Sequence, residues 1–160
     1  MKYDTIDFKI QVAGTLKDLH WKDCDRCIIF VNGQDILDIV REKEKKFFVR
    51  AKLDVNGAGE YHYMDPDKLY VYLAYAGLSC GDTKAPILCC TCDDVGCSSV
   101  RVEVHHLMNE VVWKNFESCR KSWKFGLTYK FEPKAYKDFM DRLKNWQKND
   151  NEYKAIPDKP

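Results

Sequence analysis

Alternating apolar and polar residues in the second half of the chain limit the possible folds more than any other feature. Within residues 99–106 valine stands at positions 100, 102 and 104, and this alternation is the pattern of a half-buried strand. Residues 108–110 can turn the chain, a return strand begins at Val111, and the alternation resumes in 123–131. Successive strands joined by short connections predict an antiparallel meander.

Two pairs of an acidic residue and a proline mark the starts of helices. A capping carboxylate followed by proline at the first helical position is favoured at helix N-termini, and the chain has Asp65-Pro66 and Glu132-Pro133. The second of these helices carries an apolar stripe at positions 136, 139, 140, 143 and 146. That spacing lies on one helical face, so we expect this last helix to pack on the sheet.

The first third of the chain carries further strand signals around a strong turn. Residues 6–12 alternate, with apolar side chains at the even positions, and residues 27–31 form a short apolar run. Asn32-Gly33 follows that run and is a sequence typical of tight hairpin turns. We expect residues 34–46 to form a short helix, with a hairpin return strand as the alternative, and residues 47–55 to form another strand.

Together these patterns predict an α+β fold. We expect a meandering, mostly antiparallel sheet of about six strands, covered by two or three helices. The chain has 160 residues, of which 45% are hydrophobic, and this suits one ordinary domain, which we assign to residues 1–148. Residues 149–160 are polar and contain two prolines, so we expect a frayed tail.

Charge and composition count against several classes of protein. The formal net charge of +1 gives no basic footprint for nucleic acid, so no nucleic-acid partner is expected. No run approaches the roughly 20 apolar residues of a membrane span, and the N-terminus has no apolar leader, so we expect a cytoplasmic protein without a membrane partner. Phosphate-binding glycine loops and the G-x-S-x-G motif of hydrolases are both absent.

Five of the eight cysteines lie within residues 80–97, and they form the main candidate site. Cys90, Cys92 and Cys97 make a C-x-C-x4-C run whose thiolates can converge on zinc, and we take Cys89 as the fourth ligand. The other candidates for that position are Cys80, His105 and His106. Such a closed zinc site would be structural. Redox or reactive thiols and simple packing in the core are the alternatives.

A second cysteine pair lies apart from this run. Cys24 and Cys27 form a C-x-x-C sequence that could complete a metal site from a distance or act alone as a redox dithiol. A redox pair normally lies at a helix N-terminus, where a thiol pKa is lowered. Here Cys27 leads directly into the apolar run 28–31, which is typical of a strand and argues against that geometry.

The cysteine run also belongs to a longer series of motifs. The series is C-x-C-x3-G-C at 90–97, V-x-V-x-V at 100–104, Val-Val-Trp at 111–113, and Phe131 with Tyr136. It resembles a group of small uncharacterised bacterial proteins in which a cysteine-bearing segment leads into a hairpin and a closing helix. The resemblance implies a β-rich bacterial protein in which Cys90, Cys92 and Cys97 share a role, and it assigns no catalytic residue.

These observations favour a non-enzymatic function. We expect a small binding protein that acts through a protein partner, in the manner of an immunity protein or antitoxin, with a structural zinc site. The alternative is a thiol oxidoreductase or another small enzyme that uses the cysteine cluster. A third class is a nucleic-acid-processing enzyme that uses His62 or His105.

Overall fold

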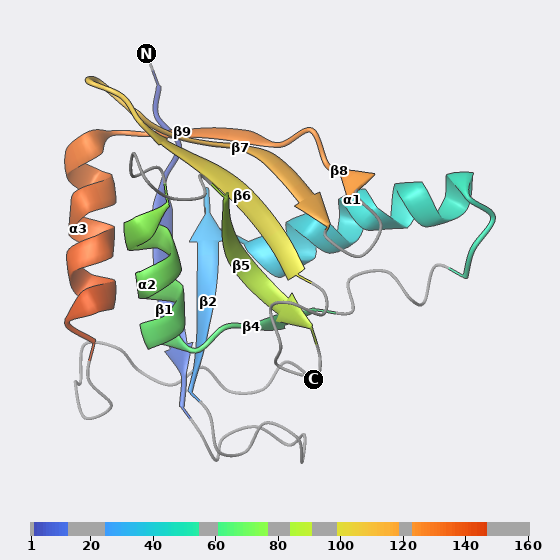
Figure 1. The fold of residues 1–160 in the computed structure, drawn as a ribbon, viewed down its shortest axis with the longest axis horizontal. Helices are drawn as coiled ribbons and strands as arrows, with labels where there is room; N and C mark the ends of the chain where they lie inside the picture. Colours follow the sequence, from blue (N-terminus) through green and yellow to red (C-terminus); the bar gives the residue numbers. More distant parts are fainter. Residues whose placement is uncertain are drawn as a thin grey trace.

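The chain folds into an α+β structure with three helices and two antiparallel sheets (Figure 1). The computed structural model describes residues 2–12, 25–54, 61–76, 84–90, 99–118 and 123–146. This architecture confirms the fold class expected from the sequence, including the six-stranded sheet and the final helix that packs on strands.

The larger sheet contains the predicted meander. Its strands are β4 (Tyr61–Tyr63), β5 (Lys84–Cys90), β6 (Ser99–His106), β7 (Val111–Ser118), β8 (Trp123–Lys124) and β9 (Thr128–Phe131). They run in the order β4-β5-β6-β7-β8, with β9 also paired to β7. The single strand expected over 123–131 is therefore divided in two, and Gly126 lies in the break with a φ of +68° that favours glycine.

The smaller sheet has the order β1-β2-β3, with bounds β1 (Ile6–Gln11), β2 (Arg26–Val31) and β3 (Gln34–Asp35). Asn32 and Gly33 connect β2 to β3 with φ values of 51° and 77°. Positive φ at both central residues is the requirement of a type I′ hairpin turn, as Asn-Gly predicts. The hairpin return proposed as the alternative for residues 34–46 is thus present, but it occupies only two residues before a helix begins.

Helix α1 (Ile36–Arg50) corrects the prediction of a strand over 47–55. The helix continues through Phe47 and Phe48, and residues 51–54 form no strand. Both rings contact Trp123 of β8, each at a centroid distance of 5.2 Å. The β propensity of the Phe-Phe-Val run is therefore overridden by packing of the last helical turns on the large sheet, and Figure 1 shows α1 running beside β8.

Helices α2 (Pro66–Tyr75) and α3 (Pro133–Lys144) begin where the sequence predicts. The Asp65 carboxylate accepts a hydrogen bond from the backbone N–H of Asp67 at 2.9 Å, and that of Glu132 accepts one from Ala135 at 2.9 Å. Figure 1 shows α2 and α3 next to each other beside β1 and β2. None of the helices in the described ranges is both long and apolar enough to cross a membrane.

One hydrophobic core unites the described elements. Phe139 of α3 packs edge-on against Phe8 of β1 at 5.7 Å, and the Trp113 indole of β7 donates a hydrogen bond to the Tyr136 hydroxyl at 3.2 Å. Backbone hydrogen bonds between described residues also join the two sheets. The Cys27 N–H donates to the Met64 carbonyl at 2.8 Å, and the Asp4 N–H donates to the Lys130 carbonyl at 2.8 Å.

Candidate functional site

The predicted zinc ligands are only partly within the described residues. Cys92 and Cys97 lie outside them, as does the side chain of Cys90, the last residue of β5. Cys89 is buried, and its Sγ lies within hydrogen-bonding distance of the carbonyl oxygens of His62 (3.6 Å) and Tyr63 (3.8 Å). Within the described ranges no three His, Cys, Asp or Glu residues are grouped to hold a metal ion. The zinc site therefore stays a prediction.

Cys27 has the properties of a packed core residue. It is 2% exposed, and burial raises the pKa of its thiol far above the ordinary value, with a further contribution from the charge of Asp65. The thiol is therefore protonated at physiological pH, whereas nucleophilic and redox chemistry needs the thiolate. Cys24, its partner in the C-x-x-C sequence, lies outside the described residues.

The two adjacent histidines of β6 have separate surroundings. His105 Nε2 lies 3.0 Å from a carboxylate oxygen of Glu103, and the Asn115 amide donates to the same oxygen at 2.9 Å. The pKa of Glu103 is lowered, first by its hydrogen bond to His105 and then by the one to Asn115. His106 instead contacts the Tyr136 ring at 5.8 Å, and burial lowers its pKa. The two imidazoles therefore do not join in one site.

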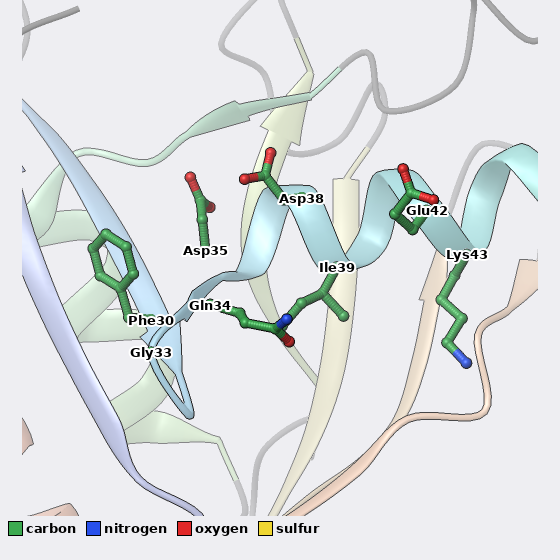
Figure 2. Close-up of a pocket in the computed structure, with 8 residues that line it drawn as sticks. All are labelled: Phe30, Gly33, Gln34, Asp35, Asp38, Ile39, Glu42 and Lys43. Atoms are coloured by element: carbon green, nitrogen blue, oxygen red, sulfur yellow. The ribbon is translucent and has the colours of Figure 1, made fainter. Parts of the chain in front are cut away.

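The structure contains a cleft that the sequence did not predict. It lies where the β2–β3 hairpin meets the first turns of α1, and it encloses about 470 Å³ (Figure 2). Its lining residues are Phe30, Gly33, Gln34, Asp35, Asp38, Ile39, Glu42 and Lys43. Figure 2 shows Phe30 at the strand side of the cleft, with Asp38, Ile39 and Glu42 extending from α1 at the other.

The apolar part of the cleft comes from Phe30 and Ile39, both of which are partly buried. Phe30 pairs with Asp35 across the β2–β3 hairpin, so the two side chains project from the same face of the small sheet. The ring already attracts one cation, because the Lys9 ammonium lies 5.5 Å from its centroid. Lys9 belongs to β1 and is not among the residues that line the cleft.

Asp35 fixes the geometry at the buried end of the cleft. One of its carboxylate oxygens accepts the Leu37 N–H at 2.8 Å and thereby caps α1, and the other accepts the Tyr63 hydroxyl. Burial and the bond to Asp35 raise the pKa of Tyr63, so its hydroxyl remains a donor throughout the physiological pH range. Asp35 is 4% exposed and thus places a carboxylate in a partly desolvated position.

Asp38 and Glu42 lie one turn apart at the open side of the cleft. Asp38 lies 3.5 Å from the Arg41 guanidinium, and Glu42 lies 3.1 Å from the Lys45 ammonium. The two carboxylate side chains are 54% and 71% exposed, so these intrahelical ion pairs are weak and exchange readily with other cations. The cleft therefore combines an aromatic and aliphatic surface with three carboxylates and one lysine, a lining that suits a cationic ligand.

Local signals for this cleft exist in the sequence, because all of its lining residues lie between positions 30 and 43. Asn32-Gly33 predicts the hairpin, and acidic residues at 35, 38 and 42 follow the spacing of one helical face. The mixed charges of residues 41–46 are typical of a solvated helix face and do not by themselves indicate a cleft. Tyr63 reaches Asp35 from a distant strand, and no sequence pattern indicates that contact.

Comparisons with known proteins add no relative from which a role for these residues could be inferred: no family model, curated protein or solved structure matches the chain.

Proposed function

We propose that this chain is a small non-enzymatic, cytoplasmic binding protein that holds a basic segment of a protein partner in the cleft between the β2–β3 hairpin and α1. The observation that carries the proposal is the lining of the cleft, which combines the apolar side chains of Phe30 and Ile39 with the carboxylates of Asp35, Asp38 and Glu42. An inhibitor of the immunity or antitoxin type is the form of such a protein that we favour.

Both parts of the lining contribute to such binding in physically distinct ways. The aromatic and aliphatic surface gains free energy when a ligand removes it from water. The carboxylates attract a basic segment over a longer range and select against acidic ones. Since Asp38 and Glu42 are exposed, their present ion pairs with Arg41 and Lys45 cost little to exchange.

The properties of Cys27 weigh against the alternative of a thiol oxidoreductase. Such an enzyme needs a thiol that ionises near neutral pH and meets its substrate. Cys27 is buried, and its pKa is raised by that burial. Cys27 lies in a mostly buried strand, and its backbone N–H donates to the Met64 carbonyl, so the residue serves the connection between the two sheets.

The proposal is tested with two short labelled peptides, one alternating lysine with leucine and one alternating glutamate with leucine. Fluorescence anisotropy at low salt should show binding of the basic peptide alone. In the Asp38→Asn, Glu42→Gln double variant its affinity should fall about thirtyfold, because each of the two lost charges contributes about 1 kcal/mol at close range in water. Salt at about 1 M should also lower the affinity of the unchanged protein for the basic peptide, because it screens the carboxylates.

A matched double variant controls for a general effect of charge. Asp67 and Asp138 are exposed acidic residues on α2 and α3, away from the cleft. The Asp67→Asn, Asp138→Asn variant has the same net charge as the cleft variant and should bind the basic peptide as the unchanged protein does. Equal binding of both peptides, or an equal loss in both double variants, would contradict the proposal.

A further inference from the structure

The Phe30 ring supplies the aromatic part of the cleft lining. Its centroid lies 5.5 Å from the Lys9 ammonium, which shows that the ring is placed where a cation can approach it. The cleft meets the same ring from the side of β3 and α1, where Lys9 does not contribute to the lining. A second cation that enters the cleft therefore has part of this ring available.

The carboxylates of the cleft have different capacities for a new ligand. Both oxygens of Asp35 already accept hydrogen bonds, from the Leu37 N–H and from the Tyr63 hydroxyl. Asp35 therefore has little capacity left to accept a hydrogen bond from a ligand. Asp38 and Glu42 are more than half exposed, and Asp38 already lies 3.5 Å from the guanidinium of Arg41. These two can exchange water or an intrahelical cation for the donors of a ligand.

Resting on the function proposed above, we infer that the cleft selects an arginine side chain of the partner over a lysine. A guanidinium is planar, stacks on an aromatic ring and donates two parallel hydrogen bonds to one carboxylate. It is also less strongly hydrated than an ammonium group, so its transfer into a cleft beside Phe30 and Ile39 costs less. The volume of about 470 Å³ exceeds that of one side chain and leaves room for an apolar neighbour of the arginine.

The test compares two peptides of equal charge and apolar content, one alternating arginine with leucine and the other lysine with leucine. Isothermal titration calorimetry on the full chain should give an affinity about fivefold higher for the arginine peptide, which corresponds to a stacked guanidinium worth about 1 kcal/mol. In Phe30→Leu, which keeps an apolar side chain and removes the ring, that preference should disappear because the affinity for the arginine peptide falls more than the affinity for the lysine peptide.

Two further variants make the outcomes distinguishable. Tyr75→Leu removes an aromatic ring that is 66% exposed on α2, and it should keep the preference for arginine. The double variant Asp38→Asn, Glu42→Gln should have a lower affinity for both peptides. Equal affinities for arginine and lysine in the unchanged protein, or a preference that survives Phe30→Leu, would overturn the inference and leave the proposed function in place. Absence of binding by both peptides would overturn the inference and the proposed function together.

Discussion

Asp35 supports two elements of the structure at once. Its carboxylate caps α1 through the Leu37 N–H and accepts the Tyr63 hydroxyl from β4. We expect Asp35→Ala to lower the free energy of unfolding by about 2 kcal/mol, because the helix loses its cap and a largely buried hydroxyl loses its acceptor. Denaturant unfolding followed by circular dichroism measures this change.

Glu42→Ala provides the control for that substitution. Glu42 belongs to the same cleft, but its side chain is 71% exposed and makes an intrahelical ion pair with Lys45. Its removal should change stability by less than about 0.5 kcal/mol. If Asp35→Ala and Glu42→Ala lower the free energy of unfolding by similar amounts, Asp35 has no special structural role.

The buried Cys27 thiol makes stability depend on alkaline pH. Its pKa is raised in the folded protein above the ordinary value of 9.0, first by burial and then by the charge of Asp65. The folded state therefore holds this proton more tightly than the unfolded chain, so the stabilisation is complete below pH 9 and is lost as pH rises further. Each such group lowers the free energy of unfolding by up to about 1.4 kcal/mol per pH unit in that range.

Denaturant unfolding under reducing conditions at about pH 8 and about pH 10 measures the effect. The unchanged protein should lose stability between these values, and Cys27→Ala should lose less, although it starts from a lower stability because it leaves a small cavity. Tyr63 and Tyr136, whose pKa values are also raised by burial, contribute only above their ordinary value of 10.0. An identical pH dependence in both proteins would be inconsistent with a buried neutral thiol at this position.

At the scale of elements, α1 shows where sequence patterns and structure diverge. Val49 lies in the helix near its C-terminal end and is 66% exposed. We expect Val49→Ala to raise the free energy of unfolding by about 0.5 kcal/mol, because alanine is the better helix former at an exposed site. The strand that the sequence suggested would give the opposite sign, since alanine is a poorer strand former than valine. Thermal and denaturant unfolding of Val49→Ala and Val49→Gly distinguishes the helix from the strand. In the helix, the free energy of unfolding of Val49→Gly should be about 1 kcal/mol lower than that of Val49→Ala.

The elements that the sequence predicts correctly are those with local determinants. Asp65-Pro66 and Glu132-Pro133 each hold the cap and the first helical residue within two positions, and both helices begin there. Strand β5 carries no alternation, because Pro86, Ile87 and Leu88 are all buried, and it was not predicted. Strand β4 has only three residues, too few for a periodic signal.

The cleft was missed for a related reason at a larger scale. Phe30 and Asp35 become neighbours through a hairpin that the sequence does predict, but Tyr63 arrives from β4 and Lys9 from β1. A sequence pattern reports the period of one element and carries no information about which side chains of distant elements share a face. The lining itself lies within residues 30–43, but the Tyr63 hydroxyl that holds Asp35 comes from the other sheet and has no local signal.

At the scale of the whole molecule, the predicted zinc site bears on the connection between the two sheets. Strand β4 pairs with β5, with Tyr61 opposite Cys90, and Met64 just beyond it accepts the N–H of Cys27 in β2. This short strand is thus the link between the sheets on that side, and β5 ends beside it. A structural zinc held by Cys90, Cys92 and Cys97, with Cys89 as the fourth ligand, would brace the end of β5 and stabilise that link.

Elemental analysis of protein purified without added metal or chelator tests this hypothesis. We expect about one zinc per chain, lost in Cys92→Ser together with several degrees of melting temperature, because a structural metal contributes directly to folding free energy. Cys24→Ser, which changes a cysteine outside the C-x-C-x4-C run, should keep the zinc and the melting temperature. If the purified protein contains no metal and melts at the same temperature with and without added zinc, the hypothesis of a structural zinc site is wrong. The link between the sheets would then rest on hydrogen bonds and core packing alone.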